Sequence, residues 1–444
     1  MDSLLSKNPE ELREQFLKLK TTEEVGTLLE VNHNQLMFNV YIRPKEERYK
    51  QFDISKRNGD SRTILAPNNS LKFIQRKLNE VLRCVYKPKA STHGFVLDKN
   101  IRTNATMHCR KKYVLNLDLK NFFPSITFKR VRGLFMAIPY ELPEEVAVLL
   151  ANICCHDRKL PQGAPTSPII SNLICSRLDT QLRQLAVRYR CVYTRYADDI
   201  TFSTRQKNFP QDLAQITTVE NKRTVVIGEP LKMLIGSNGF QINQNKVRLQ
   251  TYDKRQEVTG LTVNKFPNVN KKFVSQIRAM LHAWEVYGPE EAEREFIEKW
   301  DKKNRNPYSS SPSFKYVVKG KIEFLGMVRG KDNPKYLLFL SQLASLDSDL
   351  VKETKDSIEY NRKHLIAIRQ ALAKHFSGSE LRVLCFDLGI NPENIERRGA
   401  NLDDTILELV SHAFRNDQIE ELVNAMRNNK PNLSFQSLSK ESLS

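Results

Sequence analysis

Apolar residues recur at helical spacing in several parts of the chain. Within residues 1–36, Leu12, Phe16 and Leu19 fall on one face and polar residues separate them. Residues 71–86 carry a broader apolar stripe that predicts an amphipathic helix. The same spacing predicts helices over residues 270–300, 316–328 and, as one long helix, 347–376.

Other segments combine short apolar runs with the turn residues that flank strands. We expect strands at residues 37–42, 114–118, 193–203, 240–243 and 257–263. The run at 193–203 predicts two short strands joined by a tight turn, and a glycine inside 257–263 suggests close approach of another backbone. Asn58-Gly59 predicts a hairpin turn. The polar segments 91–96 and 104–108 are expected to be loops.

The last part of the chain predicts a small helical module. Ser377 and Glu380 form a capping-box pattern before an apolar run, and Gly389 marks the end of that helix. Helical spacing returns at Ile406, Leu407, Val410, Phe414, Ile419, Leu422, Val423 and Met426. Residues 375–430 contain ten acidic and six basic residues, a net charge of −4.

The whole chain has the opposite charge. Its 444 residues carry a formal net charge of +19, so we expect a polyanionic partner, for which nucleic acid is the usual choice. No apolar run approaches a membrane span, and the first residues lack the pattern of a signal peptide. The seven cysteines have no metal-ligand spacing. These features predict a cytoplasmic protein of two or three domains with reduced cysteines and no membrane partner.

The adjacent acids Asp198 and Asp199 interrupt the strand pattern in YTRYADDITFS. Two carboxylates at a hairpin tip raise each other's pKa unless a cation lies between them. Oxygen ligands suit Mg²⁺ or Mn²⁺, and magnesium sites usually combine one or two carboxylates with substrate phosphates. A solvated Asp-Asp turn is the alternative interpretation, and the remainder of the chain decides between the two.

A third acid, Asp118, ends the strand in YVLNLDLKNFFPSI. A lone aspartate at this place is often a helix cap or a turn former. Together with Asp198 and Asp199, it supplies the third acid of a two-metal site, in which the ions hold the attacking hydroxyl and the leaving phosphate.

Basic and flexible positions surround these acids in the sequence. Lys56, Arg57 and Arg62 flank the Asn58-Gly59 turn and suit a triphosphate clamp, although a charged surface loop has the same pattern. Gln162 and Gly163, in LPQGAPTSPIISN, would bring the backbone close to a flat partner, and a helix follows through Leu185.

Two lysine-containing segments follow the hairpin. Lys246 could protonate a departing pyrophosphate, although it would be unremarkable as a surface residue. Lys271 and Lys272 begin a basic helix that suits gripping a duplex by its phosphates.

Taken in order, these segments make residues 37–330 resemble a reverse transcriptase. The match runs through the fingers hairpin with Arg62, the first palm motif with Asp118, the PQGAPTSP loop, the YADD hairpin, the lysine strand at Lys246 and the next strand. The resemblance implies an α+β right-hand polymerase with fingers, a palm built on an antiparallel sheet and a helical thumb. A small all-α domain follows at the C-terminus.

The resemblance also implies roles for single residues. Asp118, Asp198 and Asp199 are then catalytic and hold two Mg²⁺ ions, with Mn²⁺ as the alternative metal, and Leu119 belongs to the same metal site. Phe123 lies where the family places the ring that blocks a ribose 2′-hydroxyl, which implies deoxynucleotide substrates. The implied nucleotide-binding residues are Lys56, Arg62, Phe123, Gln162 and Lys246.

Two short motifs narrow the resemblance to retron reverse transcriptases. They are NAxxH, with Asn104, Ala105 and His108, and VTG, with Val258, Thr259 and Gly260. In that group both are associated with the cognate structured RNA, so the implied RNA-binding residues are Asn104, His108, Val258, Thr259, Gly260, Lys271 and Lys272. Retron enzymes prime from a 2′-hydroxyl of their own non-coding RNA and make a small single-stranded DNA, the msDNA, that stays joined to it.

The segments LRVLCFDLGINPENI and LELVSHA resemble an effector-associated, death-like domain. This six-helix adaptor fold pairs with a matching domain on another protein. The resemblance implies recruitment of an effector, a protease being one candidate, in defence against phage. A helical extension of the thumb is the alternative.

We therefore expect an RNA-directed DNA polymerase that copies a cognate non-coding RNA, with dNTPs as substrates, and holds the resulting RNA and cDNA. A group II intron-like reverse transcriptase and a scaffold that acts mainly through its death-like domain are the alternatives. The expected domains are an N-terminal helical segment at 1–36, fingers and palm at 37–265, a thumb at 266–346, a helical linker at 347–374, the adaptor domain at 375–430 and a disordered tail at 431–444.

Overall fold

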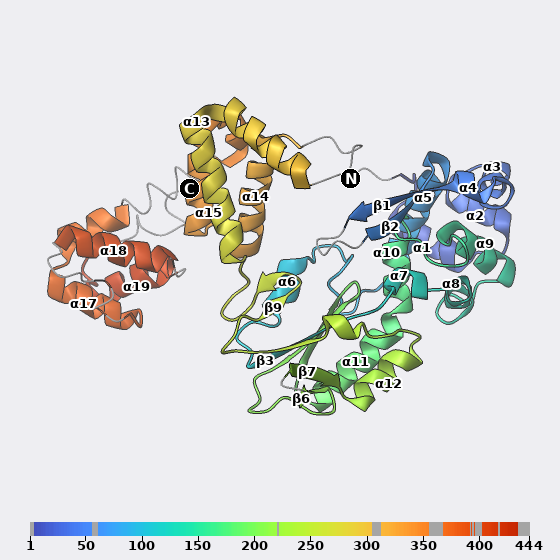
Figure 1. Ribbon diagram of the computed structural model, residues 1–444, viewed down its shortest axis with the longest axis horizontal. Helices are drawn as coiled ribbons and strands as arrows, with labels where there is room; N and C mark the ends of the chain where they lie inside the picture. Colours follow the sequence, from blue (N-terminus) through green and yellow to red (C-terminus); the bar gives the residue numbers. More distant parts are fainter. Residues whose placement is uncertain are drawn as a thin grey trace. The chain divides into compact units, whose positions relative to one another are not determined.

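The protein is described by a computed structural model that covers residues 4–55, 61–219, 222–303, 312–354, 367–390, 392, 395, 402–415 and 418–433. The chain divides into two compact units, Met1–Pro267 and Asn268–Ser444 (Figure 1). Within the described ranges, no helix is long and apolar enough to cross a membrane. The finer domain boundaries expected from the sequence stay predictions, and most of the expected tail lies outside the described residues.

The first unit begins with helices that pack into its core. Leu12, Phe16 and Leu19 are buried, as the apolar spacing predicts. The Phe16 ring lies 6.1 Å from that of Phe135 and 5.8 Å from that of Tyr140, so this segment shares one core with later parts of the unit. The helices before the first strand are α1 (Pro9–Leu17), α2 (Thr22–Leu28), α3 (His33–Met37) and α4 (Lys45–Arg48).

Residues 37–42 do not form the expected strand. Phe38–Ile42 form a π-helical turn that directly follows α3. The neighbouring residues Asn39 and Val40 are both buried, whereas a strand would bury alternate residues. The turn contacts α5 (Asn69–Val85) and α9 (Glu144–Cys154), so helix packing overrides the short apolar run.

A hairpin follows, formed by β1 (Tyr49–Ser55) and β2 (Ser61–Pro67). The two strands are antiparallel, with Ser55 opposite Ser61, which confirms the predicted hairpin. Its turn, with Lys56, Arg57 and Asn58-Gly59, lies outside the described residues. Helix α5 comes next and buries the predicted apolar face, including Ile74, Leu78, Val81 and Leu82.

The centre of the first unit is a four-stranded antiparallel sheet in the order β4-β5-β3-β8. Its inner residues are fully or almost fully buried, among them Leu115, Leu117, Ile200 and Phe202. Val114 and Leu115 are consecutive residues that point to opposite faces of the sheet, and both are buried because both faces are covered. The strands are β3 (Tyr113–Asp118), β4 (Val192–Tyr196), β5 (Asp199–Thr204) and β8 (Arg248–Thr251).

Helices and short strands connect and cover this sheet (Figure 1). A second hairpin pairs β6 (Ala214–Val219) with β7 (Lys222–Ile227). One apolar core extends from α1 through the sheet to α12. The connecting helices are α6 (Ile101–Thr106), α7 (Phe122–Ser125), α8 (Phe128–Met136), α9, α10 (Ser167–Ile174), α11 (Ser176–Arg188), α12 (Glu229–Ser237) and the 3-10 turn η2 (Gln244–Lys246).

Three expectations for the connections were wrong. Residues 104–106 belong to α6 and not to a loop, because Asn100 caps a short helix there. Residues 240–243 form no strand, and only Ile242 makes an isolated bridge, to Leu119. Residues 257–263 are a small hairpin of β9 (Glu257–Val258) and β10 (Leu261–Thr262). Gly260 meets no atom within 4 Å of an added Cβ, so its positive φ, not close packing, explains the glycine.

The second unit begins with helices α13 (Lys271–Lys303), α14 (Phe314–Arg329) and α15 (Pro334–Leu346), which contact one another. The helices predicted over residues 270–300 and 316–328 are confirmed as α13 and α14. Helix α13 is broken at Gly288, which has a φ of 80° and precedes Pro289. Buried residues at this interface include Ile277, Leu281, Val318, Ile322 and Leu340.

The expected single helix over residues 347–376 is not continuous. Ser348–Thr354 form the 3-10 helix η3, whose Val351 departs from helical geometry, and residues 355–366 lie outside the described residues. A helix then spans residues 367–375.

The C-terminal helices share an apolar core of their own that includes Leu372, Leu381, Leu384, Ile406 and Leu422. The capping box of Ser377 and Glu380 is present, and Gly389 has a positive φ after the helix, as predicted. The helices are α17 (Gly378–Asp387), α18 (Leu402–Arg415) and α19 (Ile419–Asn429).

Candidate active site

The sheet brings the three predicted acids to one end of neighbouring strands. Asp118, the last residue of β3, lies directly opposite Asp199, the first residue of β5. Asp198 occupies the turn between β4 and β5, and its carbonyl oxygen accepts a hydrogen bond from the Leu119 amide at 3.1 Å. Leu119, the other residue assigned to the metal site, is itself buried.

The electrostatic setting of these acids favours a cation. Burial raises the pKa of Asp198, and the charge of Asp118 raises it further. The Asp199 side chain reaches solvent, yet the protein around it removes part of the water from its carboxylate. This desolvation, together with repulsion from Asp198 and Asp118, raises the pKa of Asp199 to about 7. A bound cation would remove this repulsion.

Lys246 and Asn243 hold the third acid from the other side. The Lys246 Nζ atom lies 2.7 Å from Asp118 Oδ2, and Asn243 Nδ2 donates to Asp118 Oδ1 at 3.1 Å. Burial alone would lower the pKa of Lys246, but the hydrogen bond to Asp118 and the nearby acids raise it. Lys246 is therefore a cation within the acidic site. Asn243 was missed because a single asparagine in a polar turn carries no signal in the sequence.

The residues present fit divalent ions by their chemistry, because the donors are carboxylate oxygens. Within the described part of the chain, no group of three or more His, Cys, Asp or Glu side chains already has the arrangement of a metal cage. Asp118 is engaged by Lys246 and Asn243, so a cation would compete with these two side chains for it.

The β1-β2 hairpin docks next to the acids. The Leu65 amide donates to the Gln162 carbonyl at 2.9 Å. Gly163 has a φ of 134°, and an added Cβ would lie 2.7 Å from the Leu65 carbonyl oxygen. The flat partner expected at Gln162-Gly163 is therefore strand β2. Arg62, on the same strand, is near enough to lower the pKa of Asp198, whereas Lys56 lies outside the described residues.

Three aromatic rings, those of Phe95, Phe122 and Phe123, lie near one another past the end of β3. Phe123 is half-buried, and its ring centroid lies 5.3 Å from that of Phe122 and 6.2 Å from that of Phe95. Phe95 is exposed and has a φ of 61°, which is unusual for a residue other than glycine. Phe95 was missed because its segment reads as a polar loop.

The two short motifs assigned to RNA recognition meet in the structure. Helix α6 contacts β9 and β10, and Asn104 Nδ2 lies 3.5 Å from Thr259 Oγ1. His108 is fully buried, and its ring nitrogens lie 2.7 Å from Ser203 Oγ and from Thr194 Oγ1. Burial lowers the pKa of His108 to about 3, so it is neutral.

Asn104 and Val258 are buried as well. Because these side chains are buried, they cannot contact RNA directly, and they instead support the Thr259-Gly260 turn. Lys271 and Lys272 are exposed at the start of α13, in the second unit.

A buried ion pair, also missed from the sequence, supports the turn that carries Asp198. Arg195 and Asp179 are 0% and 1% exposed, and two hydrogen bonds of 2.7 Å join the guanidinium to both carboxylate oxygens. Arg195 Nη1 also donates to the Ala197 carbonyl at 3.0 Å. Ala197 has a φ of 55°, so the arginine holds a strained residue directly before the acids.

An antiparallel sheet that gathers three aspartates at one end, with a basic hairpin beside them, defines the palm and fingers of a right-hand polymerase. The sequence profile of the family "Reverse transcriptase (RNA-dependent DNA polymerase)" matches residues 54–327. A second profile, "Effector-associated domain 7", matches residues 368–431.

Proteins similar to this chain carry the same designation. The retron Mx65 reverse transcriptase of Myxococcus xanthus is 36% identical over 59% of this chain and 62% of that protein. The retron Mx162 enzyme of the same species is 31% identical over 74% and 68%, respectively. The retron Ec86 enzyme of Escherichia coli is 32% identical over 57% and 74%. The chain thus spans slightly under two thirds of the Mx65 protein and more of the other two.

The chain belongs to the reverse transcriptase family of RNA-directed DNA polymerases and, within it, to the retron reverse transcriptases, with an effector-associated domain at its C-terminus.

Proposed function

We propose that this protein reverse transcribes a cognate structured non-coding RNA into a short single-stranded DNA that stays joined to RNA. The observation that carries the proposal is the cross-strand pair of Asp118 and Asp199, with Asp198 in the adjoining turn. This arrangement supports phosphoryl transfer to a primer hydroxyl. We also propose that the protein acts in the cytoplasm, because its cysteines are free thiols, as is usual in a reducing compartment.

Each chemical task of this reaction is then assigned to residues of this chain. Asp118, Asp198 and Asp199, with Leu119 beside them, would hold two Mg²⁺ ions, which supply charge stabilisation at the attacking and leaving oxygens. Arg62 binds the triphosphate of the incoming dNTP. Lys246 carries a proton that it can give to the leaving pyrophosphate.

The pocket for the incoming nucleotide is formed by other side chains. Phe123 excludes a ribose 2′-hydroxyl by its bulk, which selects deoxynucleotides, and Gln162 contacts the nucleotide or template. Lys56 is a further candidate for the triphosphate. Lys271 and Lys272 bind RNA backbone through their charges.

The test is to sequence the nucleic acid that copurifies with the protein expressed from its native locus. The wild type is expected to carry a defined short DNA joined to RNA. The paired variant Asp198→Asn, Asp199→Asn should carry the RNA without DNA, while Asp157→Asn, an exposed acid, serves as the matched control. A wild type that carries no such DNA would overturn the proposal.

We further propose that the C-terminal domain recruits an effector protein with a matching domain, a protease being one candidate, and that the system defends against phage. Phe386 on α17 supports this, because its ring is 71% exposed and Val383 on the same helix is 45% exposed. Phe386→Ser is expected to abolish protection against phage and leave DNA production intact.

Tyr316→Ser, at an exposed ring on α14, is the control for Phe386→Ser. Equal protection by both variants would contradict the recruitment proposal. The Asp198→Asn, Asp199→Asn pair addresses the scaffold alternative, because a scaffold that needs no DNA would keep protecting the cell without the acids.

A further inference from the structure

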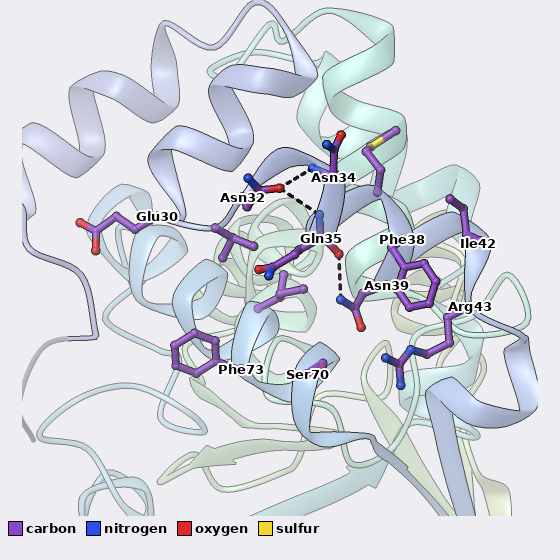
Figure 2. A pocket seen from close by; sticks show the side chains of 13 residues that line it. Glu30, Asn32, Asn34, Gln35, Phe38, Asn39, Ile42, Arg43, Ser70 and Phe73 are labelled. Atoms are coloured by element: carbon purple, nitrogen blue, oxygen red, sulfur yellow. Dashed lines mark hydrogen bonds between the residues drawn. The ribbon is translucent and has the colours of Figure 1, made fainter.

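A cavity of about 850 Å³ lies in the first unit, between the segment from Glu30 to Arg43 and the first turns of α5. Phe38, Asn39 and Ile42 of the π-helical turn line one side of the cavity, and Phe73 of α5 lies on the opposite side (Figure 2). π-Helical turns are rare and are frequently found at functional sites. The proposed polymerase chemistry uses none of these residues.

Two aromatic rings of the cavity expose their surfaces. Phe38 is 43% and Phe73 47% exposed. A cation lies over each ring: the Arg43 guanidinium carbon is 5.4 Å from the Phe38 centroid, and Lys77 Nζ is 4.8 Å from the Phe73 centroid. The acidic lining residue is Glu30, whose carboxylate accepts hydrogen bonds from the amide and hydroxyl of Ser6.

The cavity also contains buried polar atoms without a partner. Asn39 is 8% exposed and donates from Nδ2 to the Gln35 carbonyl at 2.8 Å, but its Oδ1 has no hydrogen-bond partner. Arg43 Nε, which also lines the cavity, has none either. In the view of Figure 2, Gln35 and Asn39 lie between the Phe73 and Phe38 rings. An unsatisfied buried polar group costs about 1–3 kcal/mol, which a ligand with both donors and acceptors would relieve.

We propose that this cavity binds an unpaired base of the RNA that the protein holds. A nucleobase has a flat face for the rings and an edge with donors and acceptors for Asn39 and Arg43. Aromatic rings with adjacent cations are the usual platform for single-stranded nucleic acid, and the cations at the two rings, Arg43 and Lys77, favour a polyanion over an apolar peptide. The inference rests on the proposed function, because it presumes RNA as the partner.

The experiment measures fluorescence anisotropy of a labelled oligouridine and of an abasic strand of equal length at one salt concentration. Phe38→Ala and Phe73→Ala are expected to weaken oligouridine binding between about 5-fold and about 100-fold and to leave binding of the abasic strand unchanged. Met233→Ala, at a side chain that is 70% exposed on α12, is the control and should change neither. Circular dichroism melting checks that each variant folds.

The outcomes separate the cavity from the polymerase. If the wild type extends a DNA primer on an RNA template and both ring variants bind oligouridine as tightly as the wild type, the cavity assignment is overturned and the proposed function stands. A wild type that neither extends nor binds overturns both. If UMP binds the wild type as tightly as oligouridine, the cavity takes a free nucleotide and the assignment to an RNA strand is overturned.

Discussion

Replacing Asp179 by asparagine tests whether the buried ion pair supports the turn that carries Asp198. The change keeps the side-chain volume but leaves the Arg195 charge buried without its partner. Asp179 also accepts hydrogen bonds from Tyr193 Oη at 2.7 Å and Thr92 Oγ1 at 2.9 Å. Removing one partner of a buried ion pair typically costs about 3–5 kcal/mol, a large part of the about 5–15 kcal/mol that stabilises a domain.

The matched control is Glu144→Gln, which breaks the exposed pair of Arg132 and Glu144 at 3.0 Å. That pair is expected to contribute about 0–1 kcal/mol. Both tryptophans, Trp284 and Trp300, lie in the second unit, so the first unit has no tryptophan of its own to report on this site. Hydrogen exchange followed by mass spectrometry, on peptides from α11, β4 and β5, measures the local free energy of opening directly.

Asp179→Asn should open these peptides far more often than the control does, and should reduce polymerisation because the Ala197 carbonyl loses its fixed donor. A double variant, Asp179→Leu with Arg195→Met, should recover part of the stability, since an apolar pair can replace a buried ion pair. It should not recover activity, because methionine cannot donate to the Ala197 carbonyl. Equal exchange in Asp179→Asn and Glu144→Gln would refute this reasoning.

Three further predictions concern the active site. Asp199→Asn should abolish polymerisation yet raise the melting temperature in EDTA at pH 8. The raised pKa of Asp199 gives stability that is present below pH about 4 and lost as pH rises through about 7. The gain in melting temperature should therefore vanish at pH 4, and an equal gain at both pH values would contradict the prediction. Phe123→Ala should admit ribonucleotides, measured as the ratio of kcat/KM for UTP and dTTP, with Phe95→Ala as the comparison. Lys246→Met should lower kcat by about 10²–10⁴-fold with less effect on KM, measured under saturating dNTP, whereas a change in KM alone would exclude proton donation.

Much of the local structure follows from residue patterns close together in the sequence. Strong helical spacing predicts α1, α5 and α14, and the capping box at Ser377 predicts the start of α17, because these signals depend on neighbours within one or two turns. The weaker signals failed. Residues 37–42 form a π-helical turn instead of a strand, and the polar NATMH segment begins within α6, since packing partners far along the chain decide such short runs.

The sequence alone identifies the class of polymerase and predicts the three acids of the site, because the motifs occur in a characteristic order. Only the tertiary structure decides which residues support them. Asn243 and Lys246 reach Asp118 across more than a hundred residues of chain, and Asp179 and Arg195 meet because α11 packs on β4. Such contacts leave no periodic signal. The same reason explains why His108, which belongs to a recognisable motif, is a buried support of the sheet: a motif specifies residue types, and burial depends on the whole fold.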